Sequence, residues 1–357
     1  MANLCKECGV PKIIARTHAW RDGCIVDKFG GSANFSIYEV SFHNGLIDEV
    51  SNQLGISIDW IVYIAGRHAA ARIIKNMVSS HPLLEKVIFK PPLYRLSQRA
   101  LIDFARAIGM GKIKLLVHKK GKEGAVRVTD PFHLAHCTAV ILGGLDVIYG
   151  YPLAFTAREE DGSYIGELIP DKKDDIGDEE TFIRLTTADL TPQKQAIEQE
   201  FPTCRRCGAP EELGQRFSFD MEEGVIKEKK SGERYIFYGH QSLNAILREF
   251  EKELGQDIND LFLRVEKERF SKKLAESTRD EDLWSGEELR RYLALRGFGM
   301  LKGKREVDGK TYFEVANVFI PPIVAGRLIA LWEKEHGKEG SYDLTVSDNT
   351  LQLAISP

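Results

Sequence analysis

The stretch CKECGVP (residues 5–11) recurs as CRRCGAP (residues 204–210), and both cysteines of the second copy lie 199 positions after those of the first. The chain has only six cysteines, so two copies of Cys-x-x-Cys-Gly-x-Pro indicate a repeat rather than chance. Two thiolates at this spacing supply half of a tetrahedral zinc site. The pattern therefore predicts either one shared four-cysteine site or two separate sites.

Neither copy has an evident second pair of cysteines. Separate sites would need histidine or carboxylate ligands nearby, whereas a shared site would need only the two pairs together. We therefore expect structural zinc on one set of ligands: Cys5, Cys8, Cys204 and Cys207. An iron–sulfur cluster and a redox-active pair are alternatives. The strand-then-helix setting of a redox pair is missing here.

Similarity between the two parts of the chain continues beyond the cysteines. LIDEVSNQLG (residues 46–55) matches ILREFEKELG (residues 246–255), and AIGMGK (residues 107–112) matches GFGMLK (residues 297–302). A repeated order of motifs over this length predicts an internal duplication.

Each predicted module has the same order of elements. Two β-like runs around a turn follow the cysteine pair, then come three helices, a hairpin, a further helix and a closing β-rich pair. The expected fold class is α+β: two copies of a mixed helix and antiparallel-hairpin module, joined through a four-cysteine zinc knuckle. The expected domains are residues 1–170 and 201–357, with an acidic linker at residues 171–200.

The composition is that of an ordinary soluble protein, with 43% hydrophobic and 29% charged residues. A net charge of −4 gives no general attraction to nucleic acid or to an anionic membrane. The N-terminal residues lack the pattern of a signal peptide, and no apolar run is typical of a spanning helix. We expect a cytoplasmic protein that binds neither nucleic acid nor membrane.

Two longer segments carry a resemblance to a known family. FARAIGMGKIKLLVHKKGKEGAVRVTDPF (residues 104–132) and YLALRGFGMLKGKREVDGKTYFEVANVF (residues 292–319) resemble the start of a 4-vinyl reductase-type, hydrocarbon-binding domain. AVILGGLDVIYG (residues 139–150) and IVAGRLIALWEKEHG (residues 323–337) are similar to its final helix. The segment at residues 42–73 is similar to the one that precedes this domain in the sensor modules of aromatic-responsive transcription activators.

The resemblance implies a small cavity between helices and sheet that admits a flat apolar molecule. It also implies structural zinc, and contacts through the module with a second copy of the chain, as a homodimer, or with a partner protein. The chain departs from the family pattern because the cysteines that bind zinc near the domain's end are missing. A Gly-x-x-x-x-Gly-Lys-Ser/Thr phosphate loop is also absent from the sequence.

The segment PFHLAHC (residues 131–137) places His133, His136 and Cys137 within about one helical turn. These side chains are candidate ligands for haem iron, another metal or a polar group of a bound molecule. The matching segment of the second module, VFIPPIV (residues 318–324), has none of them, so we expect a ligand in the first module only. Packing at the end of a core helix is the alternative interpretation.

A second candidate pair is His43 with Trp60, because the resembled sensors anchor a ligand's hydroxyl with a polar residue near this region. His240 precedes the corresponding helix of the second module, and a surface position is the alternative interpretation for both histidines.

These observations predict a zinc-containing protein that binds a small molecule. The expected ligand is an apolar or aromatic compound or a tetrapyrrole, held in the first module. The alternative is a metal- or haem-dependent enzyme, or a cofactor-handling factor, that uses His133, His136 and Cys137. Neither a pair of carboxylates at acid–base spacing nor a Ser-His-Asp order is evident.

Overall fold

The computed structural model describes residues 4–28, 34–79, 94–117, 124–170, 191–196, 201–254, 258–276 and 283–357. We call residues 4–170 the first half and residues 201–357 the second half. Of the predicted acidic linker at residues 171–200, residues 171–190 and 197–200 lie outside the described residues. The domain boundaries therefore remain a prediction.

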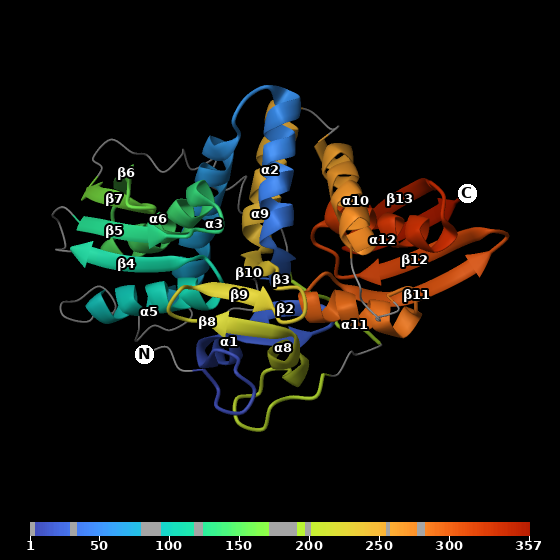
Figure 1. Cartoon of the computed structure of the whole chain (residues 1–357), viewed down its shortest axis with the longest axis horizontal. Helices are drawn as coiled ribbons and strands as arrows, with labels where there is room; N and C mark the ends of the chain where they lie inside the picture. Colours follow the sequence, from blue (N-terminus) through green and yellow to red (C-terminus); the bar gives the residue numbers. More distant parts are fainter. Residues whose placement is uncertain are drawn as a thin grey trace.

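The described elements follow the same order in both halves (Figure 1). In the first half they are α1 (Lys12–Thr17), β1 (His18–Arg21), β2 (Cys24–Asp27), β3 (Asn34–Glu39), α2 (Val40–Leu54), α3 (Asp59–Ser79), α5 (Tyr94–Ala107), β4 (Lys112–Val117), β5 (Gly124–Thr129), α6 (Leu134–Tyr149), β6 (Leu153–Glu160) and β7 (Ser163–Pro170).

In the second half the elements are α8 (Glu211–Arg216), β8 (Phe217–Asp220), β9 (Val225–Glu228), β10 (Arg234–Gly239), α9 (His240–Leu254), α10 (Ile258–Glu276), α11 (Gly286–Arg296), β11 (Met300–Val307), β12 (Lys310–Ala316), α12 (Pro321–His336), β13 (Ser341–Ser347) and β14 (Thr350–Ser356). The expectation of a mixed α+β fold with antiparallel sheets is confirmed. The prediction of two β-like runs after each cysteine pair was incomplete, because three strands follow each pair.

The described residues form three antiparallel sheets. A central six-stranded sheet has the order β1-β2-β3-β10-β9-β8, so three strands come from each half. Its two middle strands are joined in antiparallel register, with Ile37 opposite Phe237. Two four-stranded sheets, β4-β5-β7-β6 and β11-β12-β14-β13, lie on opposite sides of the central helices α2 and α9 (Figure 1).

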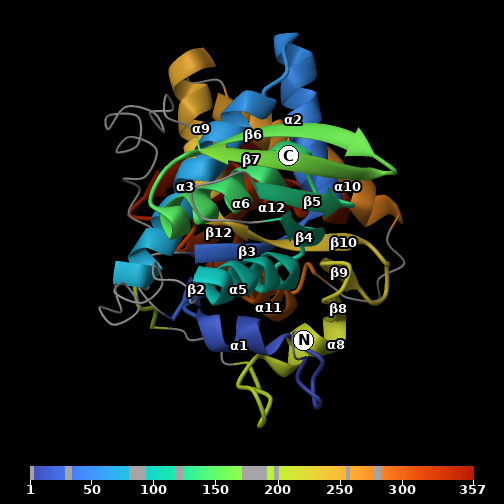
Figure 2. The ribbon, with the colours of Figure 1, turned by 90° about the vertical axis from the view of Figure 1, so that its left-hand side faces the viewer.

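The helices tie the halves together as well as packing within them. α3 packs on α6 in the first half, and α10 packs on α12 in the second. α3 also contacts α9, and α10 contacts α2, so a helix of each half packs against a helix of the other. In the view of Figure 2 the β6–β7 hairpin lies in front of α6. One continuous apolar core includes buried residues of both halves.

Turns that contain glycine join the two halves through backbone hydrogen bonds. Gly111 N–H donates to Gly224 O (2.9 Å), and Gly299 N–H donates to Gly23 O (3.0 Å). A Cβ on Gly224 would lie 2.1 Å from Gly111 O, so a side chain at this position would push the two turns apart. These paired contacts make Gly111 the counterpart of Gly299. The sequence match, which set Gly109 against Gly299, was wrong by two residues.

Candidate metal centre and apolar cavity

Each cysteine pair lies on a tight loop that the backbone closes before a short helix begins. In the first loop Cys5 N–H donates to Val10 O (2.8 Å) and Gly9 N–H donates to Cys5 O (2.9 Å). Gly9 has a φ of 75°, a left-handed conformation that glycine adopts without steric cost. Pro11 then precedes α1.

The second loop repeats this geometry. Cys204 N–H donates to Ala209 O (2.8 Å), and Gly208 N–H donates to Cys204 O (2.8 Å). Gly208 has a φ of 77°, and Pro210 precedes α8. The glycine and proline of the repeated motif are therefore needed for the turn and for the helix start.

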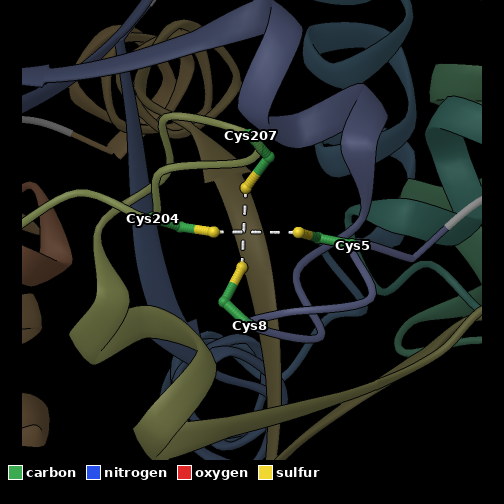
Figure 3. Close-up of side chains that lie close together, drawn as sticks. All are labelled: Cys5, Cys8, Cys204 and Cys207. Carbon is green, nitrogen blue, oxygen red and sulfur yellow. Dashed lines mark hydrogen bonds between the residues drawn. The ribbon is translucent and has the colours of Figure 1, made fainter.

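The four sulfur atoms of these loops meet in one group (Figure 3). The Sγ atoms of Cys5 and Cys204 are 3.7 Å apart, those of Cys8 and Cys207 are 3.5 Å apart, and all four lie within 4.8 Å of one another. Zn–S bonds of about 2.3 Å would place sulfur atoms about 3.8 Å apart in a regular tetrahedron. The group is thus positioned to hold one metal ion.

Backbone amides prepare one of these thiols for metal binding. Hydrogen bonds from the backbone N–H groups of Cys8 and Glu7 lower the pKa of Cys5 to about 6, against the opposing effect of burial. Burial raises the pKa of Cys8 above that of an ordinary thiol. All six cysteines are free thiols, so no disulfide competes for the four sulfur atoms. Metal ligation requires the thiolate form, which the amide hydrogen bonds at Cys5 favour.

The first loop also rests directly on the second half. A Cβ on Gly214 of α8 would lie 2.0 Å from Cys8 O. The close approach shows that the cysteine group forms at the contact between the two halves.

An apolar cavity of about 60 Å³ lies in the first half, against strand β10 and helix α9 of the second. Its wall includes Phe104 and Met110 of the first half, and Phe237 and Gly239 of the second. Other lining residues that matter below are Ala70, Ile73, His136, Val140, Tyr238 and Ser242. The cavity is therefore a product of both halves.

The structure brings three of the predicted site residues together beside this cavity. The ring of His43 lies 5.3 Å from that of His133 and 5.6 Å from that of His136, measured between ring centroids. Tyr238 Oη lies 3.3 Å from both His43 Nε2 and His136 Nδ1. Burial lowers the pKa of all three histidines, that of His43 to about 3, so their imidazoles are neutral at pH 7.

The other two candidate residues of this region, Trp60 and Cys137, lie in different surroundings. Trp60 is 49% exposed at the start of α3, so it does not share the buried surroundings of His43. Cys137 is fully buried, its S–H donates to Met110 O (3.0 Å), and burial raises its pKa to about 12. A thiol held in this way is not a ready metal ligand.

His133 has a structural role that accounts for its place. Its Nδ1 accepts a hydrogen bond from His136 N–H and so caps the N-terminus of α6 (3.3 Å). Its Nε2 lies 3.5 Å from Asp59 Oδ1. The surface interpretation of His43 and His240 is wrong, because both are buried, His240 at the first position of α9.

A buried charge cluster lies in the described part of the second half. Arg327 of α12 donates to Glu39 Oε2 (2.6 Å), to Glu266 Oε1 (2.6 Å) and to the Tyr292 hydroxyl (2.6 Å). Lys273 Nζ donates to Glu39 Oε1 (2.7 Å). We call Arg327, Glu39, Glu266 and Lys273 the charge cluster. Arg327 and Lys273 hold the pKa of Glu39 well below its usual range even though burial raises it.

Matching positions in the two halves explain the difference. Val140 and Arg327 each lie ten residues before the glycine that ends their helix, Gly150 or Gly337. Gly239 and Glu39 each end the strand that leads directly into a helix. The cavity therefore has valine and glycine at the positions where the charge cluster has arginine and glutamate.

A third matching pair follows from two ion pairs. Arg67 binds Asp146 between α3 and α6, and Lys267 binds Glu333 between α10 and α12. Ala70, three residues after Arg67, lines the cavity. Phe270, three residues after Lys267, packs against Arg327. Small side chains leave space in the first half, and large ones fill it in the second.

Sequence reasoning missed the residues that the second half contributes to the cavity, which include Tyr238, Gly239 and Ser242. Their shared signal is the join between a strand and a helix at residues 234–254, where Gly239 replaces a larger residue of the first half. Arg327 was also missed, although it is a charged residue inside the apolar segment at residues 323–332.

No family model, curated protein or solved structure matches the chain. Within the part of the chain that the structure describes, every helix is too short or too polar to cross a membrane. The geometry of the cysteine group and of the cavity therefore carries the functional argument.

Proposed function

We propose that this protein is a zinc-stabilised binding protein that holds a small apolar molecule in the cavity of its first half. Its two halves descend from one duplicated module of the 4-vinyl reductase type, and only the first keeps the cavity. The equal order of elements and the two equivalent cysteine loops support the duplication.

Zinc is the metal that we assign to the four cysteines. Four thiolates in a tetrahedral arrangement are typical of structural zinc sites, and such sites leave no open position for a substrate. The ion would link the start of the first half to the start of the second. We expect one zinc per chain, measured by elemental analysis of protein purified without added metal.

The observation that carries the binding function is the contrast between Val140 and Arg327. If an empty space at this place were a packing defect, the same fold could close it with larger side chains, as it does around Arg327. Apolar walls and small side chains are what a site for an apolar molecule requires. The presence of these apolar walls and small side chains in one of the two halves supports a binding site there.

The size of the cavity limits the ligand. An apolar cavity of about 150 Å³ holds benzene, so a cavity of about 60 Å³ suits a smaller molecule or widens on binding. A tetrapyrrole or haem is far larger, and we therefore leave it out of the proposal. The binding function needs no chemical step from His133, His136 or Cys137.

The experiment is a binding titration with small apolar compounds, followed by thermal denaturation. A compound that binds the folded state raises the melting temperature as its concentration increases. Ala70→Val should abolish this rise because two added methyl groups occupy the cavity. Gly162→Ala, in the exposed β6–β7 turn, is a control that leaves the cavity unchanged. An equal rise in Ala70→Val and the unmodified protein would contradict the assignment.

A further inference from the structure

The donor and the acceptor of each hydrogen bond near His136 can be assigned in turn, starting from Asn44. Asn44 Nδ2–H donates to Phe132 O (2.7 Å), and a carbonyl oxygen can only accept. The amide of Asn44 is thereby oriented, with its Oδ1 facing His43 Nδ1 at 3.0 Å. Since Oδ1 also only accepts, His43 Nδ1 must carry the proton.

The neutral ring of His43 then has a bare Nε2. This atom accepts the O–H of Tyr238, at a distance of 3.3 Å. With its proton committed to His43, the Tyr238 oxygen accepts from His136 Nδ1–H, also at 3.3 Å. Each group thus donates to the next in the order His136, Tyr238, His43 and Asn44, and the carbonyl oxygen of Phe132 is the final acceptor.

The chain leaves one nitrogen without a proton. His136 is only 3% exposed, and it lines the cavity. Its Nδ1 is bonded to Tyr238, whereas its Nε2 has no hydrogen-bond partner among the described residues. A bare ring nitrogen in apolar surroundings is a strong site for a donor and a poor neighbour for another acceptor. Ser242, which also lines the cavity, makes no side-chain hydrogen bond within the described residues, and its hydroxyl can either donate or accept.

We propose that the cavity selects an apolar molecule that carries one O–H or N–H donor, and that His136 Nε2 accepts its hydrogen bond. Tyr238 and His43 act as positioning residues that fix the tautomer of His136. Molecules of the same shape that offer only an acceptor, such as ethers and ketones, bind less well. This inference rests on the proposed binding function and adds the chemical class of the ligand.

A direct test is ¹⁵N NMR of the histidine side chains at pH 7. We expect both His43 and His136 to be neutral with the proton on Nδ1. In Tyr238→Phe, the proton of His136 should shift toward Nε2, because the partner of Nδ1 is gone. Tyr149→Phe, which removes another buried hydroxyl, should leave the tautomer unchanged. A proton on His136 Nε2 in the unmodified protein would overturn the inference.

The ligand class is tested with pyrrole and furan, two five-membered rings of nearly equal shape. Pyrrole offers an N–H donor and furan does not. Titrations are made with the unmodified protein and with Val140→Ala, which widens the cavity. The ratio of the Kd for furan to that for pyrrole should fall about 3- to 10-fold when Tyr238→Phe is introduced, the effect of one hydrogen bond.

The two proposals fail in different ways. Binding of both rings with a ratio that Tyr238→Phe does not change would overturn the donor selection and leave the binding function in place. Binding of neither ring, in either background, with xenon also excluded from the cavity, would overturn the binding function itself.

Discussion

Arg327 Nη2 lies 2.6 Å from Glu39 Oε2, and the two residues come from opposite halves of the chain. Both side chains are almost completely excluded from solvent. Their ion pair occupies the place that corresponds to the cavity of the first half. The same architecture thus has two interiors, one charged and filled, the other apolar and open.

Removing the arginine should be costly. In Arg327→Val, which introduces the residue of the first half, Glu39 and Glu266 lose their main partner inside the core. Breaking a buried pair of this kind costs about 3–5 kcal/mol of the free energy of unfolding. Urea denaturation measures the loss. Arg158→Leu, which removes an exposed pair with Glu167, should cost about 1 kcal/mol or less. Equal losses in the two variants would show that the charge cluster does not stabilise the fold.

Buried histidines should make the protein sensitive to mild acid. Burial lowers the pKa of His240 to about 3, from about 6.5 in the unfolded chain. The unfolded state therefore binds the proton first as the pH falls, and stability is complete above about pH 7 and decreases below it. At pH 5 the loss reaches about 2 kcal/mol for one such histidine, at 1.36 kcal/mol per pH unit.

The variant that tests this prediction is His240→Val, because Val40 begins the corresponding helix of the first half. The free energy of unfolding, measured between pH 7 and pH 5, should fall less steeply than in the unmodified protein. The difference in slope should correspond to about one fewer proton taken up on unfolding. An unchanged slope would mean that His240 already titrates in the folded protein.

The cysteine group should behave as one site. Cys5→Ser and Cys204→Ser each remove one of four ligands, so each should lose the same single metal ion and loosen the contact between α8 and the first loop. Elemental analysis and hydrogen exchange at residues 5–10 and 204–214 measure both effects. Cys24→Ser, at a buried cysteine outside the group, is the control that keeps the metal. Two metal ions per chain, each lost with its own pair, would contradict the shared site.

The backbone contacts between the halves should be sensitive to a single methyl group. Gly224→Ala adds a Cβ 2.1 Å from Gly111 O and also strains a residue with a φ of 65°. We expect destabilisation of more than about 1 kcal/mol, since both effects oppose the native turn. Gly232→Ala has a similar φ of 71° but open space around the new Cβ, so it should cost less. Similar costs would show that the contact between the turns is unimportant.

Local patterns in the sequence predicted the cysteine loops and most of the element order. The motif at residues 5–11 contains all that its turn requires, and helices such as α2 show their apolar spacing directly. Strand β1 was not predicted because its four residues, His18–Arg21, show no alternation of apolar and polar side chains. Its place depends on pairing with β2.

The walls of the cavity could not be predicted from either half alone. Tyr238 and Gly239 reach it only because β10 pairs with β3, a contact between residues about 200 positions apart. The contrast between Val140 and Arg327 becomes visible only when the two helices are aligned on Gly150 and Gly337. Tertiary structure supplied both facts.

The most direct test of the binding function is to locate xenon in the folded protein, by diffraction under pressure or by chemical shifts of methyl groups. Xenon enters dry apolar cavities without any need for polar contacts. We predict that it binds beside Ala70, Val140 and Phe104, and that Ala70→Val excludes it. No site should form around Arg327, where the charge cluster fills the corresponding space. Xenon bound near Arg327, or absent from the cavity of the first half, would contradict the account.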